Sequence, residues 1–268
     1  MRWEELTSDE FAKAVVDCGG VCVLSLAVIE RHGPHMPLGT DLINGMYVCT
    51  EAAKRESAIV FPPWYLGQIY EAKCFPGTIT TPPEMMLELT LAMLDEIGRN
   101  GFTRIIAYCA HGGNIWLSRF LTQCMLEGPR PYQLYAFDYN AGMSDQQKQA
   151  WMDALVSGET SGHGGEAETS CLLAHRPELV KMDAVAGRTG QRQGRMDHVS
   201  GGLNGFWWYA DYPTHWAGDP KDASAETGKK LAQIQIDCLA AYIAKVKADD
   251  VTPRVAQEFF DKEQQLRD

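Results

Sequence analysis

The chain has 268 residues, a formal net charge of −11, and 45% hydrophobic against 22% charged residues. This mix is typical of a packed globular protein and excludes a disordered or fibrous chain. The acidic excess repels phosphate backbones and anionic membrane surfaces, and the sequence has no dense block of Lys or Arg. We therefore expect neither a nucleic-acid partner nor a membrane partner.

The eight cysteines are scattered, without a C-x-x-C pair, and most lie in apolar stretches. In a chain of this size the pattern predicts reduced, buried thiols, as in a cytoplasmic protein. The N-terminus agrees with that location, because it carries acidic residues where a signal peptide has positive charge. Cys109 ends an apolar stretch and is interpreted as a core residue rather than a nucleophile.

The first half of the chain alternates between predicted strands and helices. After an amphipathic helix, VCVLSLAVI (21–29) is an apolar run of strand length, typical of a strand covered on both faces in a parallel sheet. A Gly- and Pro-rich loop follows, and a helix is predicted from Asp41 to about Ser57. Further strands are predicted over 58–64, 103–110 and 132–139, with helices within 82–101 and over 115–128. This alternation predicts an α/β fold with a mostly parallel central sheet.

The second half is less regular. A polar helix is predicted over 141–157, a helix after the Gly-rich turn at 162–165, and a long helix over 223–248 followed by a charged tail. Residues 185–222 are predicted to be irregular. Neither repeats nor linker composition appear, so a single domain over residues 1–268 is expected.

The first polar motif follows the first predicted strand. Loops at the carboxyl ends of parallel strands converge, so side chains placed there can meet. Glu30 and His32 share one face of an extended backbone, and Asp41 follows. Carboxylate and imidazole together suit Zn²⁺, Mn²⁺ or Fe²⁺ better than Ca²⁺ or Cu(I). Taken alone, the motif fits a solvated loop equally well.

Two further motifs also lie where a strand leads into a helix. In His111-Gly112-Gly113-Asn114 the glycines either allow a tight turn or expose N–H groups that hold developing negative charge. In the 163–168 segment, acidic residues at a helix start either complement the helix dipole or join His163 in a metal site with a proton shuttle. Together, the three motifs favour two metal ions that activate a shared water.

The strings ERHGPHMPLGTD, AHGGN and GHGGEAETS, in this order, resemble the signature segments of the creatininase family, and HWAGDPKDASAETGKK resembles its late segment. The resemblance covers roughly residues 21–245. It implies a three-layer α/β/α creatininase-like metallohydrolase domain, commonly assembled as a homo-oligomer, a hexamer. It also implies two divalent metal ions (Zn, Mn or Fe) and hydrolysis of a cyclic or linear amide in a small-molecule substrate.

The resemblance also implies roles for single residues. Glu30 and His111 would hold one ion, His32 the other, and Asp41 would bridge both. His163 matches the catalytic histidine of the family, which moves protons at the scissile bond.

One position departs from creatininase itself. That enzyme has a glutamate where this chain has Gly113, which indicates another branch of the family. Glu166 is the expected replacement ligand for the second ion. Glu168 is expected to act in catalysis, either by orienting His163 or by supporting a metal ligand without binding the ion itself.

Substrate-binding residues are expected among the glycines of the second motif and the aromatic residues of irregular segments: Gly112, Gly113, Trp64, Tyr70, Trp207, Trp208, Tyr209, His215 and Trp216. The alternative roles of the aromatic residues are to cover the core or to form a subunit interface.

The expected function is a dinuclear hydrolase in which a metal-bridging hydroxide attacks a substrate carbonyl, most simply an amidohydrolase. One alternative is a hydrolase that cleaves a carbon–carbon bond of a cyclic diketone derived from inositol. A second alternative is a non-catalytic metal-binding protein. A nucleotide-binding enzyme is not favoured, because a P-loop is absent and no G-x-G-x-x-G follows the first strand.

Overall fold

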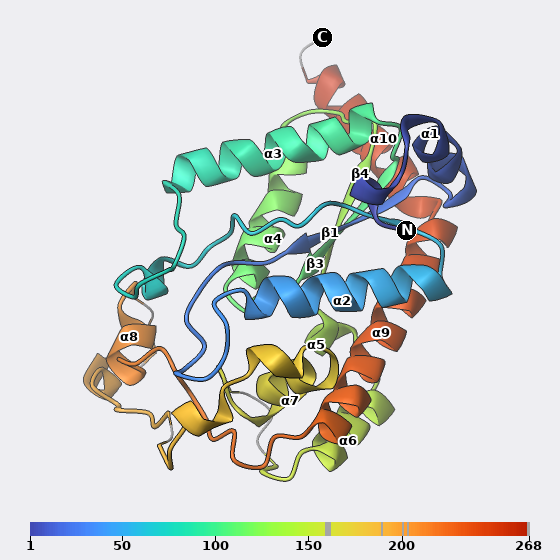
Figure 1. Ribbon diagram of the computed structural model, residues 1–268. Helices are drawn as coiled ribbons and strands as arrows, with labels where there is room; N and C mark the ends of the chain where they lie inside the picture. The colour runs from blue at the N-terminus through green and yellow to red at the C-terminus, as the bar shows by residue number, and fades with distance from the viewer. Residues whose placement is uncertain (159–161, 189, 200, 203, 267–268) are drawn as a thin grey trace.

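The centre of the protein is a four-stranded, fully parallel sheet in the order β2-β1-β3-β4 (Figure 1). The computed structural model describes residues 1–158, 162–188, 190–199, 201–202 and 204–266. The strands are β1 (Val21–Leu26), β2 (Ile59–Val60), β3 (Arg104–Cys109) and β4 (Gln133–Phe137). The mostly parallel sheet expected from the sequence is thereby confirmed.

The apolar run of β1 is continuous because both faces of the strand are covered. Its six residues are all buried. Successive side chains point to opposite faces, so Val21 and Val23 enter one core whereas Cys22 and Leu24 enter the other.

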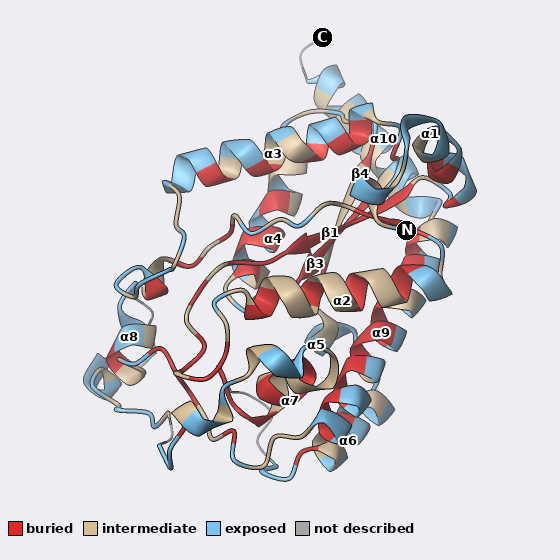
Figure 2. Ribbon diagram, viewed as in Figure 1, coloured by how far each residue is buried: buried red, intermediate tan, exposed pale blue. Residues whose placement is uncertain are grey.

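Helices cover both faces of the sheet, which gives three layers. One face packs against α2 (Thr40–Arg55), α6 (Asp145–Ala154), α7 (Glu166–His175) and α9 (Ala225–Ala248). The other packs against α1 (Ser8–Asp17), α3 (Pro83–Arg99) and α4 (Asn114–Cys124). Figure 2 shows buried residues along the strands and in stripes on these helices. The predicted three-layer α/β/α fold is confirmed.

Several boundaries differ from the sequence-based prediction. The second strand is only two residues long, since Pro62 and Pro63 lack the N–H groups that a ladder needs. The predicted helix over 141–157 is divided into α5 (Tyr139–Gly142) and α6. Ser144 caps the second of these with a capping box to Gln147.

The C-terminal part and the irregular segment contain helices that the sequence-based prediction lacked. The charged tail forms α10 (Val251–Gln265), and the aromatic segment contains α8 (Trp207–Asp211). Among the described residues, no helix is both long and apolar enough to cross a membrane.

Candidate metal centre

The starts of three helices converge at the carboxyl edge of the sheet. Asp41 lies in the first turn of α2, His111 lies just before α4, and Glu168 lies in the first turn of α7. Glu30 and His32 follow β1 and are fully buried. The topology therefore brings the three polar motifs of the sequence together.

Glu30, Asp41 and His111 form one buried cluster. His111 Nδ1 lies 2.8 Å from Glu30 Oε1 and 3.1 Å from Asp41 Oδ2. Neither carboxylate oxygen has a hydrogen-bond partner in the part of the chain that the structure describes. One ring nitrogen cannot donate to two carboxylates, whereas ligand atoms around one ion lie roughly 3 to 3.5 Å apart. These three residues therefore fit a metal ion.

His32, His163 and Glu168 form a second cluster beside the first. His32 Nε2 lies 3.2 Å from Asp41 Oδ1 and 3.7 Å from Glu168 Oε2. The rings of His32 and His163 stack with centroids 4.1 Å apart. The His32 imidazole and the Glu168 carboxylate, with Asp41 Oδ1 beside them, also fit a metal ion.

Asp41 joins the two clusters through its two oxygens. Oδ2 faces His111 and Oδ1 faces His32. A carboxylate that presents one oxygen to each of two ligand sets has the geometry of a bridging ligand. The N-terminus of α2 favours its negative charge through the helix dipole.

The charged groups of the first cluster shift one another's pKa values. Burial alone would raise the pKa of Glu30, but the charge of His111 and the hydrogen bond from His215 hold that pKa well below its usual range. Burial would lower the pKa of His111, but the Glu30 and Asp41 carboxylates raise it well above its usual range. Glu30 therefore supplies an ionised oxygen ligand to a cation.

The pKa of His163 is shifted in the opposite direction from that of His111. Burial and the neighbouring His32 lower its pKa to about 3, so its ring is neutral near pH 7. Its Nε2 lies 2.6 Å from the Arg31 carbonyl oxygen and donates a hydrogen bond to it. The other ring nitrogen, Nδ1, therefore carries the lone pair.

Comparisons with known proteins agree with this site. The family described as creatinine amidohydrolase matches residues 4–243. The chain belongs to the creatininase family. The expectation of a metal-dependent hydrolase of the creatininase type is thereby confirmed.

Individual relatives come from more than one branch of the family. The creatinine amidohydrolase of Pseudomonas putida is 28% identical over 195 residues, 68% of this chain and 74% of that protein. A mycofactocin precursor peptide peptidase of Mycobacterium ulcerans (strain Agy99) is 28% identical over 237 residues, 83% of this chain and 84% of that protein. A crystal structure of creatinine amidohydrolase superimposes with a TM-score of 0.76 at 21% identity, covering 91% of this chain and 96% of that one.

The two glutamates of α7 are placed differently from the sequence-based expectation. Glu166 lies outside the clusters, and its two oxygens accept hydrogen bonds from the backbone N–H groups of Val156 and Ser157, each at 2.8 Å. Glu168 lies in the second cluster instead, and its Oε2 accepts a hydrogen bond from Gly164 N. The carboxylate beside His32 is thus Glu168.

Glu168 is also the most accessible carboxylate of the site. Its side chain is 35% exposed, against 1% for Glu30 and 7% for Asp41. Partial burial raises its pKa to about 7, His32 opposes this shift, and Asp41 adds to it. It therefore lies on the solvent-facing side of the cluster.

The expected substrate-binding residues divide into three groups. Trp64 packs against the core and donates to the Leu66 carbonyl, and Tyr70 donates to the Thr81 carbonyl, so both have structural contacts. Trp207 is 44% exposed on α8, and Tyr209 is also exposed on that helix.

The third group of expected substrate-binding residues lies closer to the two clusters. His215 and Trp216 are buried, and His215 contacts Glu30. Gly112 is exposed, whereas a Cβ on Gly113 would meet His111 Nε2 at 2.6 Å and Gln68 Oε1. Gln68 and His111 thus leave no room for a side chain at position 113.

Asn114 has a role that the sequence analysis missed. Its buried side chain donates to the Leu26 carbonyl and accepts from Gln68 N. It thereby ties the end of β1 to the start of α4 and to the loop before α3. Its place as the last residue of the motif at 111–114 was the available signal.

Proposed function

We propose that the whole chain is one dinuclear metallohydrolase domain that cleaves an amide bond. Glu30 and His111 would hold one divalent ion, His32 and Glu168 the other, with Asp41 between them. The observation that carries this proposal is the placement of the two Asp41 oxygens, 3.1 and 3.2 Å from histidines of different clusters.

Ions held in these positions would lower the pKa of a bound water and polarise the substrate carbonyl. The chain's own residues supply the rest. His163 is neutral, and the Arg31 carbonyl fixes its Nε2 proton, so Nδ1 is free to accept a proton and pass it to the leaving nitrogen. Glu168, the most exposed carboxylate of the site, would hold the second ion from its solvent-facing side.

Similar proteins support divalent ions without deciding between them. Solved relatives include a creatininase described with Mn, at a TM-score of 0.75, and a variant described as a Zn-Zn type. We propose Zn²⁺, Mn²⁺ or Fe²⁺, because mixed carboxylate and imidazole ligands suit all three.

The substrate class we propose is a small cyclic or linear amide other than creatinine. The relatives are named for an amidohydrolase and for a peptide peptidase, both of which act on carbon–nitrogen bonds. They do not favour cleavage of a carbon–carbon bond. Gly113, with Gln68 beside it, alters the surroundings of His111 relative to creatininase itself.

We further propose that the enzyme is cytoplasmic and forms a homo-oligomer, a hexamer as in the family resemblance. All eight cysteines are free, which supports a reducing compartment.

The test is an activity panel on protein reconstituted with Mn²⁺ or Zn²⁺. Creatinine, lactams, formamides, short peptides and cyclic 1,3-diketones are offered to wild type, to Asp41→Asn, and to Asp145→Asn as a control at the exposed start of α6. We expect metal-dependent release of amine from an amide, lost in Asp41→Asn and kept in the control. Turnover of a diketone alone, or equal turnover without metal, would contradict the proposal.

A further inference from the structure

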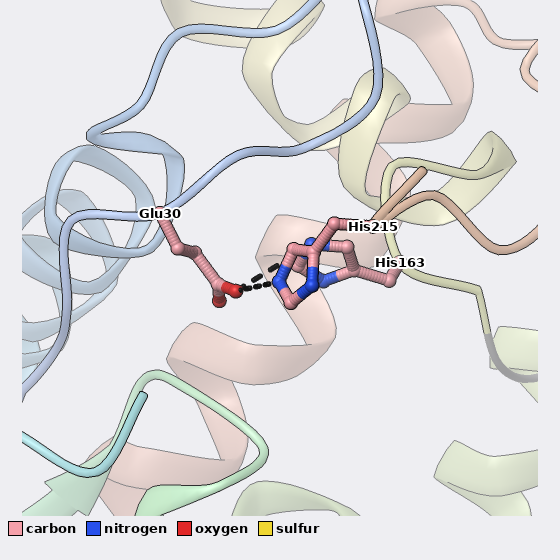
Figure 3. Close-up of side chains that lie close together, drawn as sticks. All are labelled: Glu30, His163 and His215. Atoms are coloured by element: carbon pink, nitrogen blue, oxygen red, sulfur yellow. Dashed lines mark hydrogen bonds and ion pairs between the residues drawn. The ribbon is translucent and has the colours of Figure 1, made fainter. Parts of the chain in front are cut away.

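His215 makes a contact with the metal centre that none of the three strand-end motifs includes. Its Nε2 lies 2.5 Å from Glu30 Oε2 (Figure 3). His111 lies against the other oxygen, Oε1. His163 approaches the same oxygen at 3.6 Å, and Figure 3 shows both imidazoles facing the Glu30 carboxylate. Oε2 of Glu30 is therefore hydrogen-bonded to a side chain of the protein.

The tautomer of His215 is fixed by a tryptophan. Trp208 Nε1 lies 3.0 Å from His215 Nδ1, and an indole N–H can only donate. Nδ1 must therefore accept, and the ring proton lies on Nε2, where it donates to Glu30. Both nitrogens of His215 are occupied in this way, so His215 has no lone pair to offer a cation.

The backbone holds His215 in an uncommon conformation. Its φ is +53°, one of two positive values among the described non-glycine residues. Backbone hydrogen bonds hold the chain around His215 in place. Gly33 N donates to the His215 carbonyl, and Ala217 N donates to the His163 carbonyl. Backbone strain of this kind persists where the surrounding structure over-determines it, and it gathers at functional sites.

We propose that His215 is a positioning residue for Glu30, and that Trp208 sets its tautomer. This inference rests on the proposed dinuclear site. By holding Oε2, the Trp208–His215 pair leaves Oε1 of Glu30 to the first ion and keeps Glu30 a one-oxygen ligand. Trp208 lies on α8 beside the exposed Trp207. The Trp208–His215 pair therefore also connects helix α8 to Glu30.

The test uses full-length protein, stripped of metal and titrated with Mn²⁺. His215→Met removes the donor, and His215→Gln restores an N–H at a similar reach. Trp208→Phe removes the indole N–H and keeps a smaller aromatic ring. Trp207→Phe is the matched control. We expect His215→Met to weaken binding of one ion by about 10- to 100-fold, as for other residues that orient a ligand. His215→Gln should recover most of the Mn²⁺ affinity. Trp208→Phe should bind Mn²⁺ several-fold more weakly than wild type, and Trp207→Phe should bind it as tightly as wild type.

A second readout needs no metal. In ¹⁵N-histidine NMR spectra of the metal-free protein, His215 should show a protonated Nε2 and an unprotonated Nδ1. Trp208→Phe should shift this signal towards a mixture of tautomers, even if His215→Met fails to fold.

Two kinds of failure are distinguishable. Equal Mn²⁺ affinity in wild type, His215→Met and Trp208→Phe would overturn the positioning role alone, as would an Nδ1-protonated signal in wild type. Equal losses in His215→Met and His215→Gln would reduce His215 to a packing role. A wild-type protein that binds no divalent ion would overturn the proposed function as well.

Discussion

Glu166 and Glu168 lie two residues apart in the first turn of α7, and their carboxylates point in different directions. A helix turns about 100° per residue, so the two side chains are roughly 200° apart around its axis. One side chain accepts hydrogen bonds from two backbone N–H groups, and the other faces His32. Sequence spacing supplied two carboxylates near the site without showing which of them faces inward.

Replacing each glutamate with glutamine separates their roles. Glu168→Gln removes an ionised oxygen from the second ion, so we expect about one bound ion per chain and at least about 100-fold less activity. Glu166→Gln should keep both ions. It should lose about 1–3 kcal/mol of unfolding free energy, because an amide nitrogen would face a backbone N–H.

Metal analysis and denaturant unfolding of the two variants check this pair, each serving as the control for the other. Loss of an ion from Glu166→Gln, with two ions retained in Glu168→Gln, would reverse the assignment.

His163 is the residue whose loss should affect rate without affecting metal. His163→Gln can still donate to the Arg31 carbonyl but cannot relay a proton. We expect two bound ions and a kcat about 10²- to 10⁴-fold lower on the true substrate. His175→Gln is the control, since His175 bonds to Asn44 away from the clusters. Wild-type turnover by His163→Gln would remove His163 from the mechanism.

At the scale of the elements, helix α10 depends on its connection to the sheet. Asp249 Oδ1 accepts the N–H groups of Val251 and Thr252, and Oδ2 accepts the Tyr135 hydroxyl of β4. Asp249→Ala should lower the free energy of unfolding by about 1–2 kcal/mol, as for other helix-start caps, and leave metal content unchanged. The measurement is urea unfolding.

Asp250 provides the matched control, because its exposed ion pair with Arg254 contributes little to the free energy of unfolding. If Asp250→Ala cost as much as Asp249→Ala, the cap would not be what holds α10.

Helices and strands with continuous or periodic apolar residues could be predicted from the sequence. Elements that lack such a pattern could not. The runs at 21–29 and 103–110 contain β1 and β3, because a strand covered on both faces needs no polar alternation. Helix α10 was missed because it has no buried residue, so its sequence reads as a charged tail. The meeting of Glu30, Asp41 and His111 followed from parallel topology. The role of His215 did not, because residues 185–222 carry no periodic pattern.

For the whole molecule, a buried histidine links stability to pH. His35 is 1% exposed, and burial, helped by the nearby His32, lowers its pKa to about 4. In the unfolded chain the pKa is about 6.5, so the unfolded state binds the proton more readily. Its contribution to stability is therefore complete above pH 6.5 and is lost as the pH falls towards 4, by roughly 3 kcal/mol at most.

His35→Gln should flatten this dependence in metal-free protein. Urea unfolding between pH 4.5 and 7 should show a smaller slope of stability against pH than in wild type. His198→Gln, at an exposed position, should keep the wild-type slope. Identical slopes in wild type and His35→Gln would show that another group carries the dependence.

In the proposed site, Asp41 lies between two cations. Anomalous diffraction from crystals grown with Mn²⁺ measures this directly. We expect two peaks about 3.5 to 4 Å apart, each bound to one Asp41 oxygen. A single peak, or two peaks with Asp41 bound to neither, would contradict the dinuclear account.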